Sequence, residues 1–427
     1  MTYKIFIGLT EIAGYYGNLK KGFQEIGTEC TFIDLSSHPY QYGGDDEPNF
    51  WVKVCKWSLK SLDRSNSKIM WPLLLFLTQG LKVPIFIWAL YHHNVFIFGF
   101  GKSFFRNLDL PILKLFNKKV IFTFFGSDDR PPYIDGFLRD TTLKAYPTRA
   151  RRIKTNIVTI EKYSDYIISH SAFAQFHQKQ FVNWLSIGIP FSIQPLIDSA
   201  QTKTKTKNCI VILHSPSDPI AKGSTRIRAA ISELLQKGYN INFVEITGKP
   251  HTEVIKELQE CDFVVDQVYS DTPMAGFATE AAWFGKPAVV GGYYGEYILN
   301  DYSQEHIPPS LYCHPDEITS AIERLIVDEE YRLELGRMAQ GFVRTKWTPE
   351  LVARRYLEII EGTVPKEFMF DPNNIRYVQG GGMPEYRSKE IIRTMIGQYG
   401  IESLCLSDKP ELEQKFREYA YEAALDK

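Results

Sequence analysis

The sequence predicts an α/β protein built from two similar halves of parallel strands and helices. Short apolar segments with the length of buried strands recur in the first half, at residues 4–7, 31–35, 95–98, 120–124 and 166–169. Helical stretches are expected between them, at 17–26 and 103–116, and strands that alternate with helices usually form a parallel sheet. The alternation begins again further along the chain, with strands at 209–213, 241–246, 263–265 and 288–291.

A polar repeat at 202–207 separates the two halves. It consists of alternating Thr and Lys without an apolar residue, which is typical of a solvated linker. We therefore expect two domains, residues 1–200 and 201–348. Helices of the second half are expected from Ser224, near 252–259 and from Ala275. A helix-rich region follows at 316–327, 330–344 and 349–361, and residues 363–427 carry helical patterns at 388–399 and 411–423 to which we assign no function.

The bulk composition excludes several classes of protein. A net charge of −1 over 427 residues gives no overall attraction to nucleic acid or to an anionic membrane. The six cysteines are scattered without a Cys-x-x-Cys pair, which fits reduced thiols in the cytoplasm better than a disulfide framework or a zinc site. The apolar run at the N-terminus is too short for a signal peptide. We expect a cytoplasmic protein, with the inner face of the cell membrane as the alternative place.

The segment at residues 70–100 raises a membrane question. Two apolar runs, 71–77 and 83–90, are separated by Gln79, Gly80 and Lys82, and neither reaches the roughly 20 residues that a spanning helix needs. The favoured interpretation is a core helix followed by the buried strand 95–98. The alternative is a surface helix that docks on the bilayer, because aromatic residues are dense here and prefer interfaces.

Residues 264–290 form the most informative stretch. A buried strand is followed by a turn with Gly276, a short helix that carries Glu280, the sequence Gly-Lys-Pro at 285–287, and a second buried strand. Turn amides at a helix N-terminus suit an anion, and a carboxylate one turn further along suits a pair of hydroxyls. These groups are the ones that would hold a nucleoside diphosphate by its phosphates and ribose.

This order of elements resembles the donor-site segment of the GT-B glycosyltransferases, in particular the retaining family-4-like group that builds bacterial surface polysaccharides. The resemblance implies two Rossmann-like domains that face each other across a cleft, a crossover helix at 349–362 that returns to the N-terminal domain, and a helical C-terminal extension at 363–427. It implies transfer of a sugar, with retention, from a nucleotide-diphosphate donor to a hydroxyl of a glycan or polyprenyl-linked acceptor. Glu280 would accept hydrogen bonds from the ribose.

The chain departs from this family at the donor sugar. Members carry a second acid eight residues before the ribose-binding Glu, and that position is Thr272 here, with Asp271 one residue away. Either Asp271 meets the sugar on a rearranged loop, or the backbone amides of Met274, Ala275 and Gly276 do so.

A second donor element lies at residues 213–226. The resemblance places Lys222 on the diphosphate, whereas the Arg that members carry five residues earlier is Ser217 here, so Arg226 is the substitute we expect. Fixed cations would stabilise the departing diphosphate. Ser215 and Ser217 are expected to contact the donor, with capping of the turn or helix as the alternative.

In the first half, Gly14 and Gly17 follow the first strand and would let the loop approach a substrate, although a tight connection explains them equally well. Asp128 lies in a Gly-Ser-Asp-x-Arg sequence that resembles an acceptor-side loop, with Phe125 where members often have His. It would orient the acceptor hydroxyl or stabilise positive charge at the anomeric carbon, and capping of the following turn is the alternative. The basic run at 139–154 is either a solvated helical face or a contact for a polyanionic acceptor.

No Asp-x-Asp pair occurs in the chain, so the resemblance implies a transferase that needs no metal and no other cofactor. Two other functions stay open: a non-catalytic scaffold that binds nucleotide, and a nucleotide-sugar epimerase. We expect no nucleic acid partner, because no aromatic residues are interleaved with the basic run.

Overall fold

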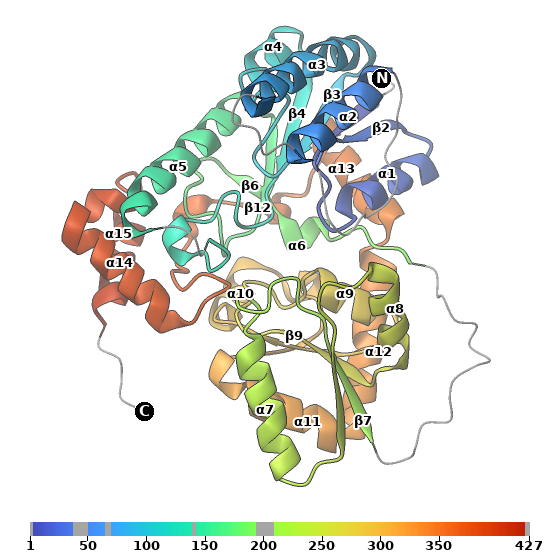
Figure 1. Cartoon of the computed structure of the whole chain (residues 1–427), viewed down its shortest axis with the longest axis vertical. Helices are drawn as coiled ribbons and strands as arrows, with labels where there is room; N and C mark the ends of the chain where they lie inside the picture. Colours follow the sequence, from blue (N-terminus) through green and yellow to red (C-terminus); the bar gives the residue numbers. More distant parts are fainter. Residues whose placement is uncertain (1–2, 37–49, 65–69, 139–141, 194–208, 423–427) are drawn as a thin grey trace.

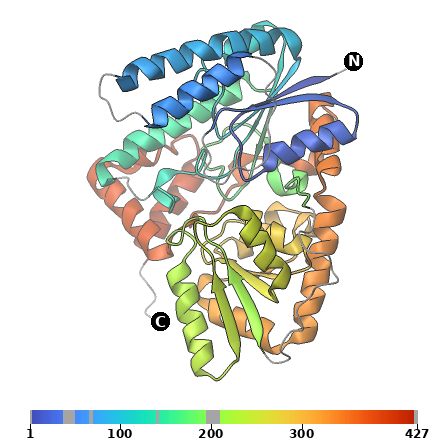
Figure 2. The same cartoon turned by 45° about the vertical axis from the view of Figure 1, so that its right-hand side comes forward.

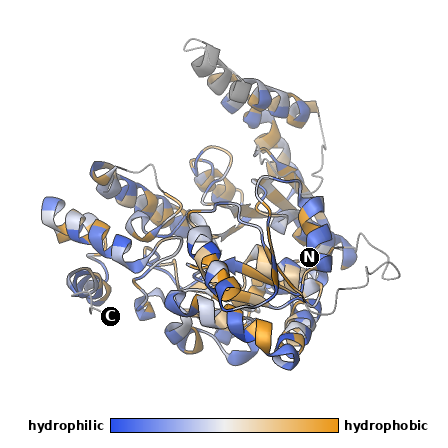
Figure 3. Ribbon diagram, turned by 60° about the horizontal axis from the view of Figure 1, so that its bottom comes forward, coloured by the Kyte–Doolittle hydropathy of each residue, from blue (hydrophilic) through white to orange (hydrophobic). Residues whose placement is uncertain are grey.

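The computed structural model describes residues 3–36, 50–64, 70–138, 142–193 and 209–422, and the predicted linker at 202–207 lies outside them. Within the described residues the chain forms two α/β domains, drawn one above the other in Figure 1. Each has a sheet with helices on both faces (Figure 2), and all strand pairs are parallel except one at the edge of the N-terminal sheet, in line with the alternation of strands and helices in the sequence. Hydrophobic residues concentrate in the strands, whereas hydrophilic residues alternate with them along the outer helices (Figure 3).

The N-terminal domain is organised around a seven-stranded sheet with the order β12-β6-β5-β4-β3-β1-β2. The strands are β1 (Lys4–Leu9), β2 (Glu29–Asp34), β3 (Val95–Gly99), β4 (Lys119–Thr123), β5 (Tyr166–Ser169), β6 (Phe181–Asn183) and β12 (Met369–Phe370). The helices of residues 1–200 are α1 (Tyr15–Glu25), α2 (Phe50–Arg64), α3 (Met70–His92), α4 (Leu110–Leu115), α5 (Tyr146–Tyr163) and α6 (Trp184–Ile187).

The C-terminal domain holds a five-stranded parallel sheet with the order β11-β10-β9-β7-β8. Its strands are β7 (Ile210–His214), β8 (Ile241–Glu245), β9 (Phe263–Gln267), β10 (Ala288–Gly291) and β11 (Leu311–Cys313). The helices are α7 (Ser224–Gln236), α8 (His251–Glu260), α9 (Gly276–Trp283), α10 (Gly295–Asp301), α11 (Ile318–Val327) and α12 (Glu329–Lys346). The carboxyl ends of β7 and β9 lead into the loops that carry the predicted donor residues, which is where ligands of parallel sheets usually bind.

Helix α13 (Pro349–Glu361) returns the chain to the N-terminal domain, where it packs against α1. Thr348 caps its first turn and Gly362 ends it in the left-handed conformation. The two helices approach so closely that a Cβ on Gly22 would lie 1.9 Å from the carbonyl oxygen of Pro349. The hydroxyls of Tyr15 and Tyr356 lie 3.1 Å apart in the buried contact. Glycine at position 22 is therefore a steric requirement of this helix pair.

The residues after α13 complete the N-terminal domain. β12 pairs antiparallel with β6, and α14 (Glu385–Tyr399) and α15 (Pro410–Tyr421) pack beside α5 (Figure 1). Their side chains share one hydrophobic cluster with the sheet, including Ile392, Met395 and Phe416, which are fully buried. The part for which the sequence suggested no function is thus a structural part of the N-terminal domain.

Most predicted elements agree with the structure, and residues 103–116 are the clearest exception. Only α4 is an α-helix there, because Arg106 and Asn107 adopt positive φ angles that a continuous helix does not tolerate. The carboxylate of Asp109 accepts hydrogen bonds from the Ser103 hydroxyl and the Phe105 amide and so fixes a turn in place of the first helical turns.

The segment at residues 70–100 forms a helix with one buried and one exposed side, followed by a buried strand. β3 forms as predicted, and α3 buries Ile85, Phe86 and Ala89 in the domain core. The opposite side of α3 faces solvent with Phe76 and Tyr91. Among the described helices, none has the length and apolar character that crossing a membrane requires.

Candidate functional site

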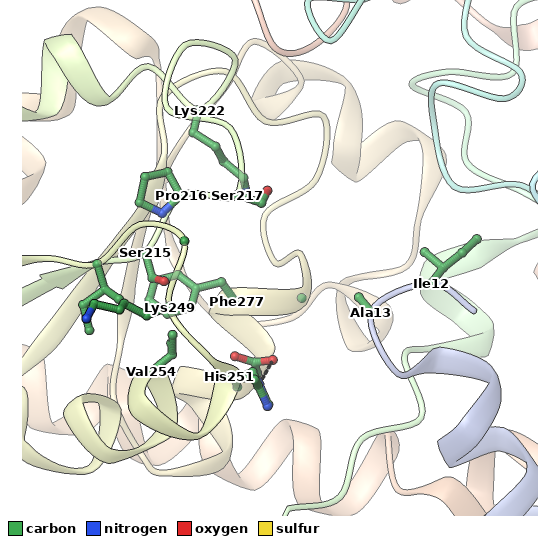
Figure 4. Close-up of a pocket in the computed structure, with 14 residues that line it drawn as sticks. Ile12, Ala13, Ser215, Pro216, Ser217, Lys222, Lys249, His251, Val254 and Phe277 are labelled. Carbon is green, nitrogen blue, oxygen red and sulfur yellow. Dashed lines mark hydrogen bonds and ion pairs between the residues drawn. The ribbon is translucent and has the colours of Figure 1, made fainter. Parts of the chain in front are cut away.

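A cavity of about 310 Å³ lies between the two domains and collects most of the predicted donor residues. The C-terminal domain forms one wall of the cavity with the β7–α7 loop, the β8–α8 loop, the start of α8 and the start of α9. Ile12 and Ala13, from the loop after β1, face it from the N-terminal domain (Figure 4). The C-terminal lining residues are Ser215, Pro216, Ser217, Lys222, Ile246, Gly248, Lys249, His251, Val254, Gly276, Phe277 and Glu280. The volume is in the range of small-molecule sites.

Glu280 lies in this wall, on the second turn of α9. Its Oε1 is 2.8 Å from Nε2 of His251, at the start of α8, and the Glu280 side chain is only 10% exposed. Burial opposes protonation of His251, but the hydrogen bond and the charge of Glu280 outweigh it and raise the pKa of the imidazole. The pair fixes the carboxylate at the cavity surface and leaves its second oxygen available to accept a hydrogen bond.

The N-terminus of α9 opens into the same cavity. Ala275 is the N-cap residue, and its side chain makes no capping hydrogen bond to the amides of the first turn. Gly276 and Phe277 line the cavity, and a Cβ on Gly276 would meet no atom within 4 Å, so the start of α9 borders open space. Helix N-termini with free amides attract anions.

The N-terminus of α1 is different. The carboxylate of Glu11 accepts hydrogen bonds from the amides of Ile12, Tyr16 and Gly17, at 2.7, 3.1 and 2.8 Å. Burial raises the pKa of Glu11, and these amides partly offset the effect. The amide of Gly17 therefore donates to Glu11 and is not free to bind a substrate. Gly14 is the N-cap of α1 in a left-handed conformation, and it is not among the residues that line the cavity. Of the two helix N-termini, only that of α9 is open to an anion.

Lys222 lies at the edge of the cavity, at the end of the turn that precedes α7. Its ammonium is 3.1 Å from Oδ1 of Asp266, a buried residue at the end of β9. An ammonium has three donors, so this ion pair holds the lysine in place and leaves further donors for a ligand. Ser215 and Ser217 belong to the same β7–α7 loop and also line the cavity.

Three predicted donor residues lie away from the cavity lining. Met274 is buried, with 1% of its surface exposed. Asp271 is engaged by Arg130 of the N-terminal domain, so its carboxylate is already paired. Arg226 donates to Asp316 at 2.9 Å and is not among the lining residues, which include Lys222. Ala275, one of the three predicted backbone donors, is not among the lining residues either and forms the N-cap of α9.

Asp128 is buried in the N-terminal domain, and its carboxylate accepts hydrogen bonds from the amides of Phe125 and Gly126 at 2.9 and 3.0 Å. These bonds fix the backbone before Asp128, whereas the alternative that the sequence allowed was a cap of the turn after it. Burial, with the nearby charge of Asp129, raises the pKa of Asp128 to about 8. Burial therefore favours the protonated form of this carboxyl more than that of an exposed aspartate.

Two features of the site have no clear signal in the sequence. His251 follows the loop residue Pro250, and only the tertiary fold places it opposite Glu280. His177 lies between two buried carboxylates, 3.2 Å from Asp129 and 3.0 Å from Glu161. Burial alone would lower the pKa of His177, but the hydrogen bonds and charges of the two carboxylates outweigh burial. The pKa of His177 is therefore raised. These three side chains are closed to solvent, and they link α5 to the loop at residues 125–130.

The described residues contain no group of three or more His, Cys, Asp or Glu side chains that could hold a metal ion. The six cysteines are free thiols.

Comparison with known proteins identifies the fold. No protein-family model and no curated protein sequence matches the chain. Among solved structures, Anabaena HepE in complex with UDP matches with a TM-score of 0.51 and 12% sequence identity, over 85% of this chain and all of that one. Its complex with UDP and glucose matches with a TM-score of 0.50 and 12% identity, over 84% and 100% of the two chains. The chain has the GT-B fold. In GT-B terms, α13 is the helix that crosses back, and the cavity lies in the cleft between the two domains.

Proposed function

We propose that this GT-B protein is a glycosyltransferase that takes its sugar from a nucleoside diphosphate donor. The observation that carries the proposal is the grouping of Glu280, Lys222 and the open N-terminus of α9 around one cavity. The diphosphate would bind the first-turn amides of α9 and the Lys222 ammonium, and the ribose hydroxyls would donate to Glu280. The UDP complexes of HepE, which shares the fold, support a nucleoside diphosphate as the ligand.

The transfer reaction would require these groups to stabilise the departing diphosphate. Negative charge grows on the diphosphate as the bond to the anomeric carbon breaks, and Lys222 and the α9 amides are fixed where they would stabilise it. Asp266 keeps the Lys222 ammonium in position. We propose a retaining, metal-independent reaction, as the resemblance implies, in which the leaving phosphate takes the proton of the acceptor hydroxyl on the same face of the sugar.

The acceptor would enter from the N-terminal domain, which supplies the opposite wall with Ile12 and Ala13. We propose a glycan or a lipid-linked saccharide of surface polysaccharide assembly, on the resemblance of the sequence around Asp128. Asp128 is buried and accepts hydrogen bonds from the amides of Phe125 and Gly126, so its role would be to hold its loop in shape.

Calorimetric titration of the purified protein with UDP, GDP, ADP and CMP, with and without EDTA, tests the donor site. One nucleoside diphosphate should bind with the same affinity in both conditions. Release of that nucleotide from its sugar conjugates, with and without candidate acceptors, then tests transfer. Binding without any turnover would favour the non-catalytic scaffold, and binding that requires a metal would contradict the metal-independent reaction.

A further inference from the structure

Three pairs of oppositely charged side chains reach the donor cavity. Each pair contributes at least one lining residue, and Lys222, Lys249 and His251 are drawn in Figure 4. The pairs are Lys222 with Asp266 at 3.1 Å, Lys249 with Glu253 at 3.8 Å, and His251 with Glu280 at 2.8 Å. A lysine ammonium and a carboxylate are both charged at neutral pH, so each lysine pair is neutral as a whole.

The pair of His251 and Glu280 is different, because an imidazole is charged only when both of its nitrogens hold a proton. Burial opposes protonation of His251, but the hydrogen bond and the charge of Glu280 outweigh burial and raise the pKa of the imidazole above its ordinary value of 6.5. The pair is therefore neutral at a pH below the raised value and carries one negative charge above it. This change alters the net charge at the cavity surface.

His214 is the second imidazole at this end of the C-terminal sheet. It ends β7, which packs against α8, and it is completely buried. Its Nδ1 lies 2.7 Å from the carbonyl oxygen of Val265 and its Nε2 lies 2.8 Å from the Ser224 hydroxyl. Burial lowers the pKa of His214. His214 therefore stays neutral in the pH range in which His251 gains or loses its proton.

The charge of Glu280 affects any anion bound at the start of α9. The helix begins at Gly276, and Glu280 follows one turn later, after a rise of about 6 Å. At this separation the carboxylate of Glu280 repels a diphosphate at the first-turn amides, and a proton on His251 offsets the repulsion. His251 also donates its Nε2–H to Glu280 in either charge state, because a carboxylate only accepts hydrogen bonds.

We propose that His251 is a positioning residue of the donor site that makes donor binding depend on pH. Its Nε2–H holds the Glu280 carboxylate in place for the ribose at any pH. Its positive charge, present only at lower pH, cancels the charge of Glu280, so that an anionic nucleotide sugar binds more tightly in mild acid than in mild alkali. This inference rests on the proposed function and adds a dependence on pH to the same site.

Calorimetric titration of the full-length protein with UDP-glucose, GDP-mannose and ADP-glucose, at about pH 6 and about pH 8.5, tests the proposal. These probes have no terminal phosphate and therefore lack the phosphate pKa of about 6, so the charge of their diphosphate is the same at both pH values. The wild type should bind its preferred conjugate about threefold or more tightly at the lower pH.

Two variants of His251 separate its hydrogen bond from its charge. His251→Gln keeps an amide N–H donor for Glu280 but is never charged, so it should bind the conjugate with the wild-type affinity of pH 8.5 at both pH values. His251→Leu removes the donor as well, and its affinity should be about tenfold lower than that of His251→Gln at both pH values. Melting temperatures establish that both variants are folded.

The matched control is His314→Gln. His314 belongs to the same domain, is 47% exposed beside Asp316 and is not among the residues that line the cavity. This variant should keep the affinity and the pH dependence of the wild type.

The outcomes separate this inference from the proposed function. Equal wild-type affinity at both pH values, a pH dependence that persists in His251→Gln, or wild-type binding by His251→Leu would overturn the role of His251 and leave the donor site standing. A wild type that binds none of the three conjugates at either pH would contradict the donor site itself, and the inference with it. A purely structural role of His251 would lower the melting temperature of His251→Gln without changing the pH dependence of binding.

Discussion

Arg130 of the N-terminal domain donates a hydrogen bond to the carboxylate of Asp271 in the C-terminal domain, and both side chains are almost completely buried. Arg130 also lies 3.3 Å from Asp135 of its own domain. Burial raises the pKa of Asp271, and the Arg130 charge partly offsets the effect. The residue that the sequence offered for the donor sugar therefore serves as a link between the two domains.

Asp271→Asn should destabilise the protein strongly, because it leaves the buried guanidinium with one carboxylate fewer. We expect a loss of about 3 kcal/mol in the free energy of unfolding, measured by urea denaturation. Asp316→Asn is the matched control, since it breaks the exposed ion pair with Arg226 and should cost less than about 1 kcal/mol. Similar losses in the two variants would contradict the role of Asp271 as a buried link.

Glu280→Ala should weaken nucleoside diphosphate binding, because the ribose loses its acceptor. A loss of about 1–3 kcal/mol in binding free energy is expected in a calorimetric titration. The control is Glu253→Ala, an exposed acid of α8 that pairs with Lys249. An unchanged affinity in Glu280→Ala would remove this residue from the ribose site.

Lys222→Gln should lower turnover far more than it changes the KM of the acceptor. Loss of one fixed donor to the departing diphosphate typically lowers kcat by about 10²–10³-fold. Lys249→Gln is the control, because Lys249 lines the same cavity but is 59% exposed. Steady-state kinetics distinguish the two, and a change confined to the acceptor KM would move Lys222 out of the donor role.

The His251–Glu280 pair predicts a pH dependence of stability. The folded pKa of His251 is raised above its ordinary value of 6.5, so the contribution of the pair is complete below that pH and is lost as the pH rises through the raised value. Wild type and Glu280→Gln should therefore differ more in free energy of unfolding at about pH 6 than at about pH 8.5. Denaturation curves at both pH values measure this, and a difference that does not change with pH would contradict it.

Gly381→Ala should disturb the contact between the domains. A Cβ at this position would lie 2.3 Å from Oδ1 of Asp271, and the backbone here is held between Ile134 and Gly136. We expect a lower melting temperature by thermal scanning. Gly397→Ala is the control, since a Cβ there meets no atom within 4 Å and alanine favours a helix. Equal behaviour of the two variants would argue against the tight packing at Gly381.

The sequence predicted those parts of the structure that local patterns determine. The bounds of α13 follow from Thr348, the proline after it and Gly362, because each of these residues acts on the adjacent backbone. The alternation of strands and helices along the chain also followed from the pattern, whereas the grouping of Glu280 with Lys222 was expected from the family resemblance.

Other parts depend on contacts between distant residues. Asp271 and Arg130 are 141 positions apart, and His251 and Glu280 are 29 apart, so no local pattern indicates either pair. The part played by residues 363–422 depends on their packing against β6 and α5, which a helical pattern alone does not reveal.

Strand β12 has a consequence for the synthesis of the chain. The N-terminal domain cannot finish its sheet until residues 369–370 leave the ribosome, after the whole C-terminal domain. Until then β6 is an unpaired edge, and the hydrophobic surface that α14 and α15 cover is exposed. The second domain of the chain is therefore free to complete its fold before the first, and the nascent protein carries an incomplete, aggregation-prone N-terminal domain while residues 209–421 are synthesised.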